Sequence, residues 1–308
     1  MGRRPSAGPP LADLIDSWQL SLEAAQKSPR TITAYTGTAK RLAAWLAKQE
    51  HPADTEQVDA PHIRAWLKAE AERTSAVSAL HQYRNVRVFF GWLEKEGERL
   101  APNPMARVTA PQAARKIKAT LNGEQLAALL KACEGNGFEA RRDAALVMVM
   151  VDTGCRVGGM AGMLTANVTL PKRTIKVILK GGDELILPLG QKSAAAVDRY
   201  LRARARHPRA RSPYLWLGVK GHGIDHFGVS GIQAMLSRRG KQAGIPGLTP
   251  HFFRRTFARS WLDAGGSEFD LMQITGWKTR TMIDIYAGDL AAERARETHK
   301  RLSPGDRL

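Results

Sequence analysis

The sequence predicts a two-domain protein that is mainly α-helical, with a small β-sheet restricted to its second half. Three observations lead to this fold class. The chain has 308 residues, about twice the ~150 residues of an ordinary domain. Apolar side chains recur at helical spacing through the first half, and no strand pattern interrupts them. In the second half, two short β-like runs flank a Lys-Gly-Gly-Asp turn, which predicts an α+β domain.

The first half is expected to be all helical. Ser28-Pro29 supplies an N-cap and a proline at the first helical position. Further helices are expected over 58–67, after Asp59, and over 74–93. We expect most of the aromatic side chains to lie in a core and not to stack on nucleic-acid bases. The apolar residues at helical spacing are Tyr35, Leu42, Trp45, Leu46, Ile63, Trp66, Leu67, Val77, Leu80, Val86, Phe89, Phe90 and Leu93.

Two nearby prolines within 100–105 break this pattern, and the chain then stays rich in Pro, Ala, Lys and Arg as far as Lys118. Arg115, Lys116 and Lys118 are candidate contacts with a phosphate backbone, although a solvated linker explains them equally well. The predicted division is a disordered basic N-terminus (1–10), a helical domain (11–105), a linker (106–118), a second domain (119–290) and a C-terminal tail (291–308).

The second half alternates helical and strand-like patterns. Asn122, with Gln125 three residues later, predicts a capped helix through Leu130. A nearly continuous apolar run predicts a buried helix over 141–151. Strands are expected over 174–179 and 184–187. Further helical patterns follow at 193–206, 230–243, 254–263 and 269–275.

The charge predicts a polyanionic partner. Lys and Arg number 47 against 29 Asp and Glu, so the formal net charge is +18. Both halves are basic, and cationic side chains that neutralise phosphates release condensed counterions. Neither end carries a strongly amphipathic basic helix, so a nucleic acid is favoured over a membrane surface.

The rest of the composition excludes several classes of protein. Two cysteines are too few for a disulfide framework, and no run approaches the roughly 20 apolar residues of a membrane span. No secretion signal is evident. We therefore expect a soluble protein of the cytoplasm. No metal-ligand spacing and no phosphate-binding loop occur, so we expect neither a metal nor a cofactor.

A set of chemically capable residues follows in a fixed order in the second half. Each has an ordinary structural explanation, such as a surface arginine, a solvated turn lysine or a half-buried tyrosine. Their joint order on a basic chain favours a functional site. The set is Arg156 after Thr153-Gly154, Lys180 in the hairpin turn, His251 and Arg254 at a helix start, Trp277 after Gly276, and Tyr286.

This set resembles that of the tyrosine recombinases, the phage-type integrases. The segment around Arg142-Asp143 that leads to Thr153-Gly154 is similar to the first catalytic segment of the family. Lys180 lies eight residues before Pro188, and 249–258 looks like the His-x-x-Arg segment. The helical half resembles the core-DNA-binding domain. The chain departs from the family pattern at Gly159 (commonly acidic), Leu179 (often Gly), Asp183 and Leu185 (often basic) and Arg255 (often His).

The chemistry that this resemblance implies is phosphodiester transfer without a cofactor. Tyr286 is expected to attack the phosphate and form a covalent 3′-phosphotyrosine. Arg156 and Arg254 are expected to hold the non-bridging oxygens, and Lys180 to protonate the leaving 5′-oxygen. His251 either accepts the tyrosine proton or holds the phosphate. Trp277 either offers its indole N–H to a phosphate oxygen or only packs. Arg255 is a further candidate DNA contact.

The resemblance also implies an assembly. The two domains form a C-shaped clamp around double-stranded DNA that carries specific recombination sites. The chain, monomeric when free, forms a homotetramer on DNA and exchanges strands through a Holliday junction. Accessory host or phage proteins are additional expected partners, and the protein is expected near the nucleoid. The tail is either a helix that docks on a neighbouring protomer or a solvated end.

The sequence alone is compatible with four functions. A mobile-element or phage integrase is slightly favoured by the unusual residues around Gly159 and Lys180. The second is an Xer-type chromosome or plasmid resolvase. A type IB topoisomerase would use the same covalent chemistry without needing two sites. A catalytically silent DNA-binding protein would have no need of Tyr286.

Overall fold

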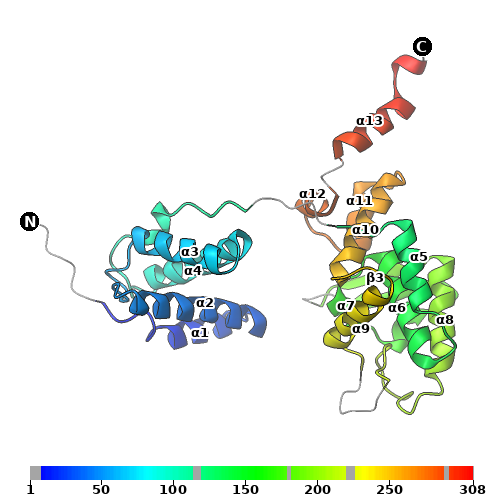
Figure 1. Cartoon of the computed structure of the whole chain (residues 1–308), viewed down its shortest axis with the longest axis horizontal. Helices are drawn as coiled ribbons and strands as arrows, with labels where there is room; N and C mark the ends of the chain where they lie inside the picture. Colours follow the sequence, from blue (N-terminus) through cyan, green and yellow to red (C-terminus); the bar gives the residue numbers. More distant parts are fainter. Residues whose placement is uncertain (1–7, 114–118, 179–181, 220–225, 288–290, 308) are drawn as a thin grey trace, which may run out of the picture. The chain divides into compact units, whose positions relative to one another are not determined.

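The computed structural model describes residues 8–113, 119–178, 182–219, 226–287 and 291–307. For residues 286, 287, 292–294 and 307 it describes the backbone alone. The chain divides into two compact units, Met1–Lys116 and Ile117–Leu308 (Figure 1). Among the described residues, no helix is long and apolar enough to cross a membrane.

The first unit is a helical bundle, as the spacing of its apolar residues predicts. Its helices are α1 (Ile15–Ala24), α2 (Pro29–Lys48), α3 (Ala60–Arg73) and α4 (Ala76–Lys95), followed by the 3₁₀ turn η1 (Pro104–Arg107). The Ser28 side chain accepts a hydrogen bond from the Thr31 N–H, and Asp59 forms a capping box with His62. These caps explain why α2 begins directly after Ser28, as predicted, and why α3 begins after Asp59, at Ala60, and not at the predicted residue 58.

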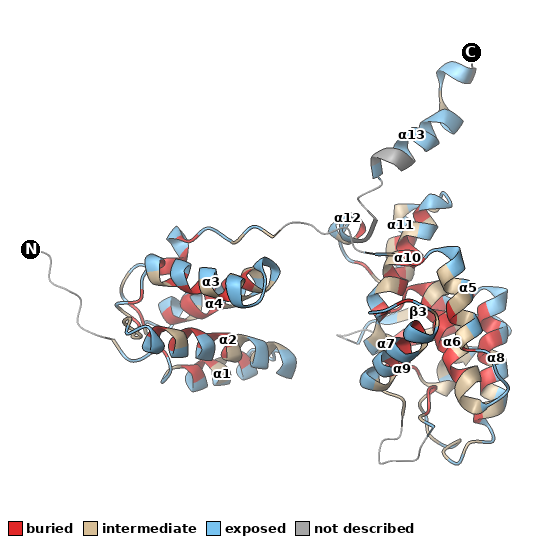
Figure 2. Ribbon diagram, in the orientation of Figure 1, coloured by how far each residue is buried: buried red, intermediate tan, exposed pale blue. Residues whose placement is uncertain are grey.

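Aromatic side chains fill the centre of this bundle. Trp18, Trp66, Phe89 and Phe90 are fully buried, and the Trp18 and Phe89 rings lie 4.7 Å apart. Figure 2 shows that the buried residues of this unit lie on the faces that its helices turn toward one another. The prediction that most of these rings belong to a core is therefore confirmed.

The second unit is mixed. Its helices are α5 (Gly123–Ala132), α6 (Phe138–Thr153), α7 (Val157–Ala161), α8 (Gln191–Arg204), α9 (Val229–Gln242), α10 (Pro250–Asp263), α11 (Glu268–Thr275), α12 (Thr281–Ala287) and α13 (Ala291–Leu302), with 3₁₀ turns η2 (Thr165–Asn167) and η4 (Gly305–Arg307). Its strands β1 (Val168–Thr169), β2 (Thr174–Ile178) and β3 (Glu184–Pro188) form one antiparallel sheet in the order β1-β2-β3, with Ile175 opposite Leu187. The predicted fold class is confirmed.

Several element boundaries differ from the prediction. Helix α10 starts at Pro250 and not at residue 254, because Thr249 is extended and Pro250 suits the first helical position. Strand β3 extends to Pro188, one residue beyond the predicted end, whereas the predicted end of β2 at Leu179 lies outside the described residues. The sequence did not single out α1 as a separate helix. It also did not predict β1, α7 or α12, which are too short to show a period of their own.

Helix α6 is fixed by a buried ion cluster. Asp143 is fully buried and accepts hydrogen bonds from Arg142, Arg238 and Arg239 at 2.7, 3.1 and 2.9 Å. The Arg142 guanidinium lies 3.9 Å from the centre of the Phe227 ring. Because a buried carboxylate is costly unless it is fully paired, this cluster holds α6 firmly against α9.

Candidate active site

Arg156 stands on a sharp turn between α6 and α7. Helix α6 ends at Thr153, and Gly154 takes the left-handed conformation, with φ of 56°. A Cβ on Gly154 would lie 2.8 Å from Cδ1 of Phe257 on α10, so both the backbone and the available space require glycine. Arg156 follows as the N-cap of α7, and its side chain is exposed.

Arg254 lies inside the unit, where it connects three helices. Its side chain is 2% exposed and extends from the first turns of α10. Nη1 donates to the Gly154 carbonyl at 2.8 Å, and Nη2 donates to the Thr275 carbonyl at 3.1 Å. One guanidinium therefore binds the C-terminal ends of both α6 and α11, where carbonyls lack helical partners and the helix dipole is negative.

The two helix ends that meet Arg254 are built alike. Each ends in Thr-Gly, and each glycine is left-handed, with φ of 56° at Gly154 and 65° at Gly276. Each threonine is buried and donates its hydroxyl to the carbonyl four residues back, at 2.6 Å for Thr153 and 2.7 Å for Thr275. The turns after the two helices carry Arg156 and Trp277.

Trp277 packs beside Arg254. Its side chain is buried, and its ring centre lies 5.0 Å from the Arg254 guanidinium carbon. Phe257 of α10 and Ile283 of α12 belong to the same small hydrophobic cluster as Trp277. This cluster holds α12 against α10 and α11.

Tyr286 lies in the last turn of α12, on the backbone that this cluster positions. Its side chain lies outside the described residues. His251 occupies the first turn of α10, directly after Pro250, and is exposed. The structure thus brings together the elements that carry Arg156, Arg254, Trp277 and Tyr286, with His251 at the start of the central helix.

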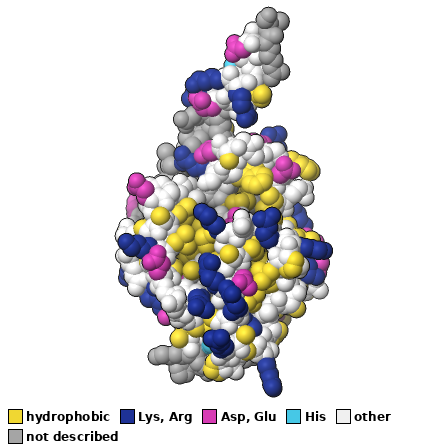
Figure 3. Space-filling model, turned by 90° about the vertical axis from the view of Figure 1, so that its right-hand side faces the viewer, with side chains coloured by type: hydrophobic (Ala, Val, Ile, Leu, Met, Phe, Trp, Pro, Cys, Tyr) yellow, Lys and Arg dark blue, Asp and Glu magenta, His cyan; other side chains and the backbone are white. Residues whose placement is uncertain are grey.

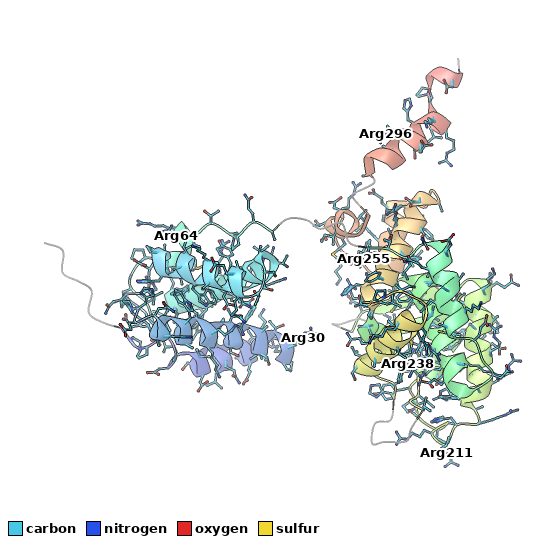
Figure 4. All side chains as sticks on the ribbon, viewed as in Figure 1. Arg30, Arg64, Arg211, Arg238, Arg255 and Arg296 are labelled. Carbon is cyan, nitrogen blue, oxygen red and sulfur yellow. The ribbon has the colours of Figure 1, made fainter. Side chains whose placement is uncertain are left out.

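Arg255, the candidate DNA contact on α10, has a structural partner. Its Nε donates to the Ala119 carbonyl at 3.0 Å, and its guanidinium lies 5.0 Å from the Phe252 ring. Figure 4 shows Arg255 on α10 and Arg238 on α9. Arg255 therefore ties α10 to the beginning of the second unit. The other candidate DNA contacts, Arg115, Lys116 and Lys118, lie outside the described residues.

Lys180 also lies outside the described residues, but both strands that lead to it are described. Ile178 pairs with Glu184 across the hairpin, and Lys176 forms an ion pair with Glu184 at 2.8 Å. Asp183 forms an ion pair with Lys278 at 2.9 Å, which raises the pKa of Lys278 through the hydrogen bond and the carboxylate charge. This pair joins the hairpin to the residue that follows Trp277.

Gly159, at a position where the family commonly has an acidic residue, packs against a cysteine. A Cβ there would lie 3.0 Å from Sγ of the buried Cys155. Burial raises the pKa of the Cys155 thiol to about 11, although Arg254 and Arg156 act in the opposite direction. The effect of burial on the thiol pKa is thus larger than the opposite effect of the two arginine charges. At neutral pH the Cys155 thiol beside the candidate site stays protonated.

No group of three or more His, Cys, Asp or Glu side chains suited to a metal ion occurs in the described part of the chain. No sequence pattern indicated the roles of Thr275, Phe257 or the Asp183–Lys278 pair, because each acts through a contact between distant segments. Gly154 did have a signal in the sequence, because it follows closely after the expected buried helix, and glycine is the commonest residue at a left-handed helix end.

We expect Cys155 to be unreactive in the folded protein. Burial raises its pKa from about 9 to about 11, so at pH 8 the reactive thiolate is about 100-fold scarcer than in the unfolded chain. Alkylation by iodoacetamide, followed by mass spectrometry in a Cys133→Ser variant, should be slower by at least that factor in the native state than in guanidinium.

The same shift lowers stability at high pH. Between about pH 9 and pH 11 the unfolded chain loses a proton that the folded chain keeps, so the free energy of unfolding should fall as the pH rises. Equal alkylation rates in the native and unfolded states would contradict this account of Cys155.

Comparison with protein families gives two matches in chain order. The model of the phage integrase family matches residues 119–293, and the model of the phage integrase N-terminal SAM-like domain matches residues 14–97. Curated relatives include the tyrosine recombinase XerC of Corynebacterium efficiens, 26% identical over 99% of this chain and 95% of that protein. The tyrosine recombinase XerD of Listeria monocytogenes is 25% identical over 90% of this chain and 93% of that protein.

Solved structures show the same fold. A lambda integrase dimer bound to a core site has a TM-score of 0.71 and 18% identity, over 90% of this chain and 95% of that chain. The Tn1549 transposon integrase, in complex with a circular-intermediate DNA, has a TM-score of 0.73 and 18% identity, over 97% and 100% of the two chains. The family match covers more than half of the sequence, and so the chain belongs to the phage integrase family, the tyrosine recombinases, which are enzymes of DNA recombination.

Proposed function

We propose that the protein is a site-specific recombinase that cleaves and rejoins DNA through a covalent 3′-phosphotyrosine at Tyr286. One observation carries this proposal. The buried Arg254 guanidinium joins the helix end that precedes Arg156 to the helix end that precedes Trp277. The cluster around Trp277 includes Ile283 of α12, the helix of Tyr286.

The proposed reaction divides its tasks among these residues. The Tyr286 oxygen attacks phosphorus, the bond to the 5′-oxygen breaks, and the phosphotyrosine ester keeps the bond energy for rejoining, so no nucleotide cofactor is consumed. Arg156 and Arg254 bind the non-bridging oxygens because a guanidinium keeps its charge. The exposed Arg156 can offer phosphate two parallel hydrogen bonds, whereas Arg254 contributes its charge and the N–H groups other than those that bind its two carbonyl partners. Such preorganised charge is commonly the largest catalytic contribution.

Two further roles concern proton transfer and phosphate binding. Lys180 supplies a proton to the leaving 5′-oxygen, and positive charge gathered around the same phosphate would favour this by making an ammonium group more acidic. His251, exposed at the start of α10, accepts the tyrosine proton or binds phosphate. Trp277 donates its indole N–H to a phosphate oxygen or acts by packing against Arg254.

Both units take part in DNA binding under this proposal. The helical unit (11–105) and the catalytic unit (119–290) clamp the duplex, and the linker arginine and lysines contact its phosphates. The excess of basic residues in both halves favours this arrangement, and binding should weaken steeply with added salt. Tail residues 291–308, whose described side chains in α13 are exposed, serve as a contact between protomers.

Strand exchange would proceed in a homotetramer through a Holliday junction. We propose a mobile-element or phage integrase, and the second candidate is an Xer-type resolvase, favoured by the curated XerC and XerD relatives that match along nearly their whole length. Integration requires two unlike sites on separate molecules, whereas a resolvase acts on two like sites of one molecule. Recombination assays with the two substrate arrangements separate these roles.

Replacement of the nucleophile gives the primary test. On nicked suicide DNA that carries candidate sites, the wild-type protein should form a covalent adduct that survives a denaturing gel. Tyr286→Phe, which lacks only the phenolic oxygen, should bind the same DNA and form no adduct. An adduct with Tyr286→Phe would refute the assigned nucleophile. Relaxation of supercoiled DNA without any specific site would instead identify a topoisomerase.

The Asp183–Lys278 pair generates a second prediction. Because it joins the hairpin of Lys180 to the Trp277 turn, Asp183→Ala and Lys278→Ala should each slow single-turnover cleavage about two- to fivefold at low salt, the size expected for an exposed ion pair. The charge-swapped double variant, Asp183→Lys with Lys278→Asp, should recover most of the rate.

Salt dependence supplies the control for this pair. The defect of the single variants should shrink at high ionic strength, because screening already weakens the wild-type pair. Asp198→Ala breaks the comparable exposed pair with Arg202 on α8 and should leave the rate unchanged. A swapped variant slower than both single variants would show that the pairing itself is unimportant.

A further inference from the structure

An open groove lies between α5, α6 and α8 of the second unit, and its volume is about 540 Å³. Helix α6 forms its floor, and α5 and α8 form its walls. The residues of the active site do not line it. Its apolar lining residues include Ala127 and Leu130 from α5, Ala144 and Met148 from α6, and Ala195 and Ala196 from α8.

Small side chains make this groove a depression in a helical surface. Alanines at 140, 144, 195 and 196 lower the floor and one wall, and Met148 adds a polarisable apolar surface at one end. On α8, Lys192, Ala195 and Arg199 recur at intervals of three and four residues. Seven residues of helix extend about 10.5 Å, so the lined face spans about two helical turns.

The rim of the groove is strongly basic. Lys131, Arg141, Lys192 and Arg199 stand around it, against the single carboxylate of Glu134. Within the described ranges, none of these four cations takes part in an ion pair. By contrast, Arg238 and Arg239 on the neighbouring α9 are both paired with Asp143. Figure 3 shows hydrophobic side chains on the side of the unit where α8 lies, with Lys and Arg among them.

We propose that this groove binds an acidic amphipathic helix of a partner protein. The apolar floor accepts side chains at i, i+3 or i+4 and i+7 of about two helical turns, and the four cations pair with Asp or Glu on the flanks. Small floor residues let the backbone of such a helix approach closely. Charge complementarity selects the acidic partner and sets the rate of encounter.

Two other candidate occupants, helix α13 of a second copy and duplex DNA, fit the groove less well. Helix α13 of a second copy carries four basic residues, Arg294, Arg296, Lys300 and Arg301, against Glu293 and Glu297, so the basic rim would repel it. Duplex DNA would satisfy the cations but would leave the apolar floor without a matching surface. An acidic amphipathic helix satisfies both the rim and the floor.

Binding can be measured with designed peptides by fluorescence anisotropy on the full-length protein. The probe is a helical peptide with Leu at i, i+3 and i+7 and Glu elsewhere. Comparison probes are its scrambled isomer, an oligo-glutamate of equal charge and a short DNA duplex. The acidic amphipathic peptide should bind at least about tenfold more tightly than the scrambled isomer and the oligo-glutamate.

Variants locate the binding. Lys192→Glu with Arg199→Glu should weaken peptide binding at least about tenfold by reversing the rim charge, and Ala195→Trp should weaken it by filling the groove. Arg202→Glu on the same helix, which does not line the groove, is the matched control and should change little. All three variants should keep wild-type cleavage of suicide DNA, which shows that they are folded.

A photo-crosslinker on the peptide should label residues within 140–148 and 192–199. Three results would overturn the proposal. The first is equal affinity for the scrambled or oligo-glutamate peptide, which would mean simple charge attraction. The second is unchanged peptide binding by Ala195→Trp. The third is DNA affinity that falls in parallel with peptide affinity in Lys192→Glu with Arg199→Glu, which would make this face a DNA surface.

Discussion

The organisation of the catalytic unit depends on one buried guanidinium. Arg254 is almost completely removed from solvent, and a buried cation is tolerated only where acceptors or opposite charge surround it. The carbonyls of Gly154 and Thr275 meet this need at the C-terminal ends of α6 and α11. Two negative helix ends thereby converge on one positive charge, and the turns that follow them carry Arg156 and Trp277.

This constraint explains the repeated Thr-Gly at the two helix ends. Glycine permits the left-handed turn that ends each helix, and the threonine hydroxyl satisfies a carbonyl four residues back. At Gly154 the absence of a side chain also admits Phe257, so α10 packs directly on the end of α6. Arg156 is exposed while Arg254 is buried. The two arginines therefore differ in what they do for the fold, although both are proposed to bind phosphate.

The sequence predicted features that depend on neighbouring residues, such as helix starts. It missed features that depend on contacts between residues far apart in the chain. Caps at Ser28, Asp59 and Asn122 marked the starts of α2, α3 and α5, because capping acts within four residues. The order of Arg156, His251, Arg254, Trp277 and Tyr286 indicated a site, and a resemblance to a family supplied the roles. No local pattern could indicate that Arg254 would meet Thr275, that Asp143 would pair with Arg238 and Arg239 of α9, or that Asp183 would reach Lys278.

Hydrogen–deuterium exchange on an Arg254→Lys variant tests the central role of this guanidinium most directly. A lysine ammonium lacks the planar, forked geometry of arginine, so it cannot donate to the Gly154 and Thr275 carbonyls at the same time in the wild-type arrangement. The account predicts faster exchange in peptides that cover 154–160 and 272–281, with a loss of about 2 kcal/mol or more in unfolding free energy. Arg255→Lys, which loses its bond to Ala119 on the same helix, should alter exchange only near 119–121. Wild-type exchange at both helix ends in Arg254→Lys would contradict the account.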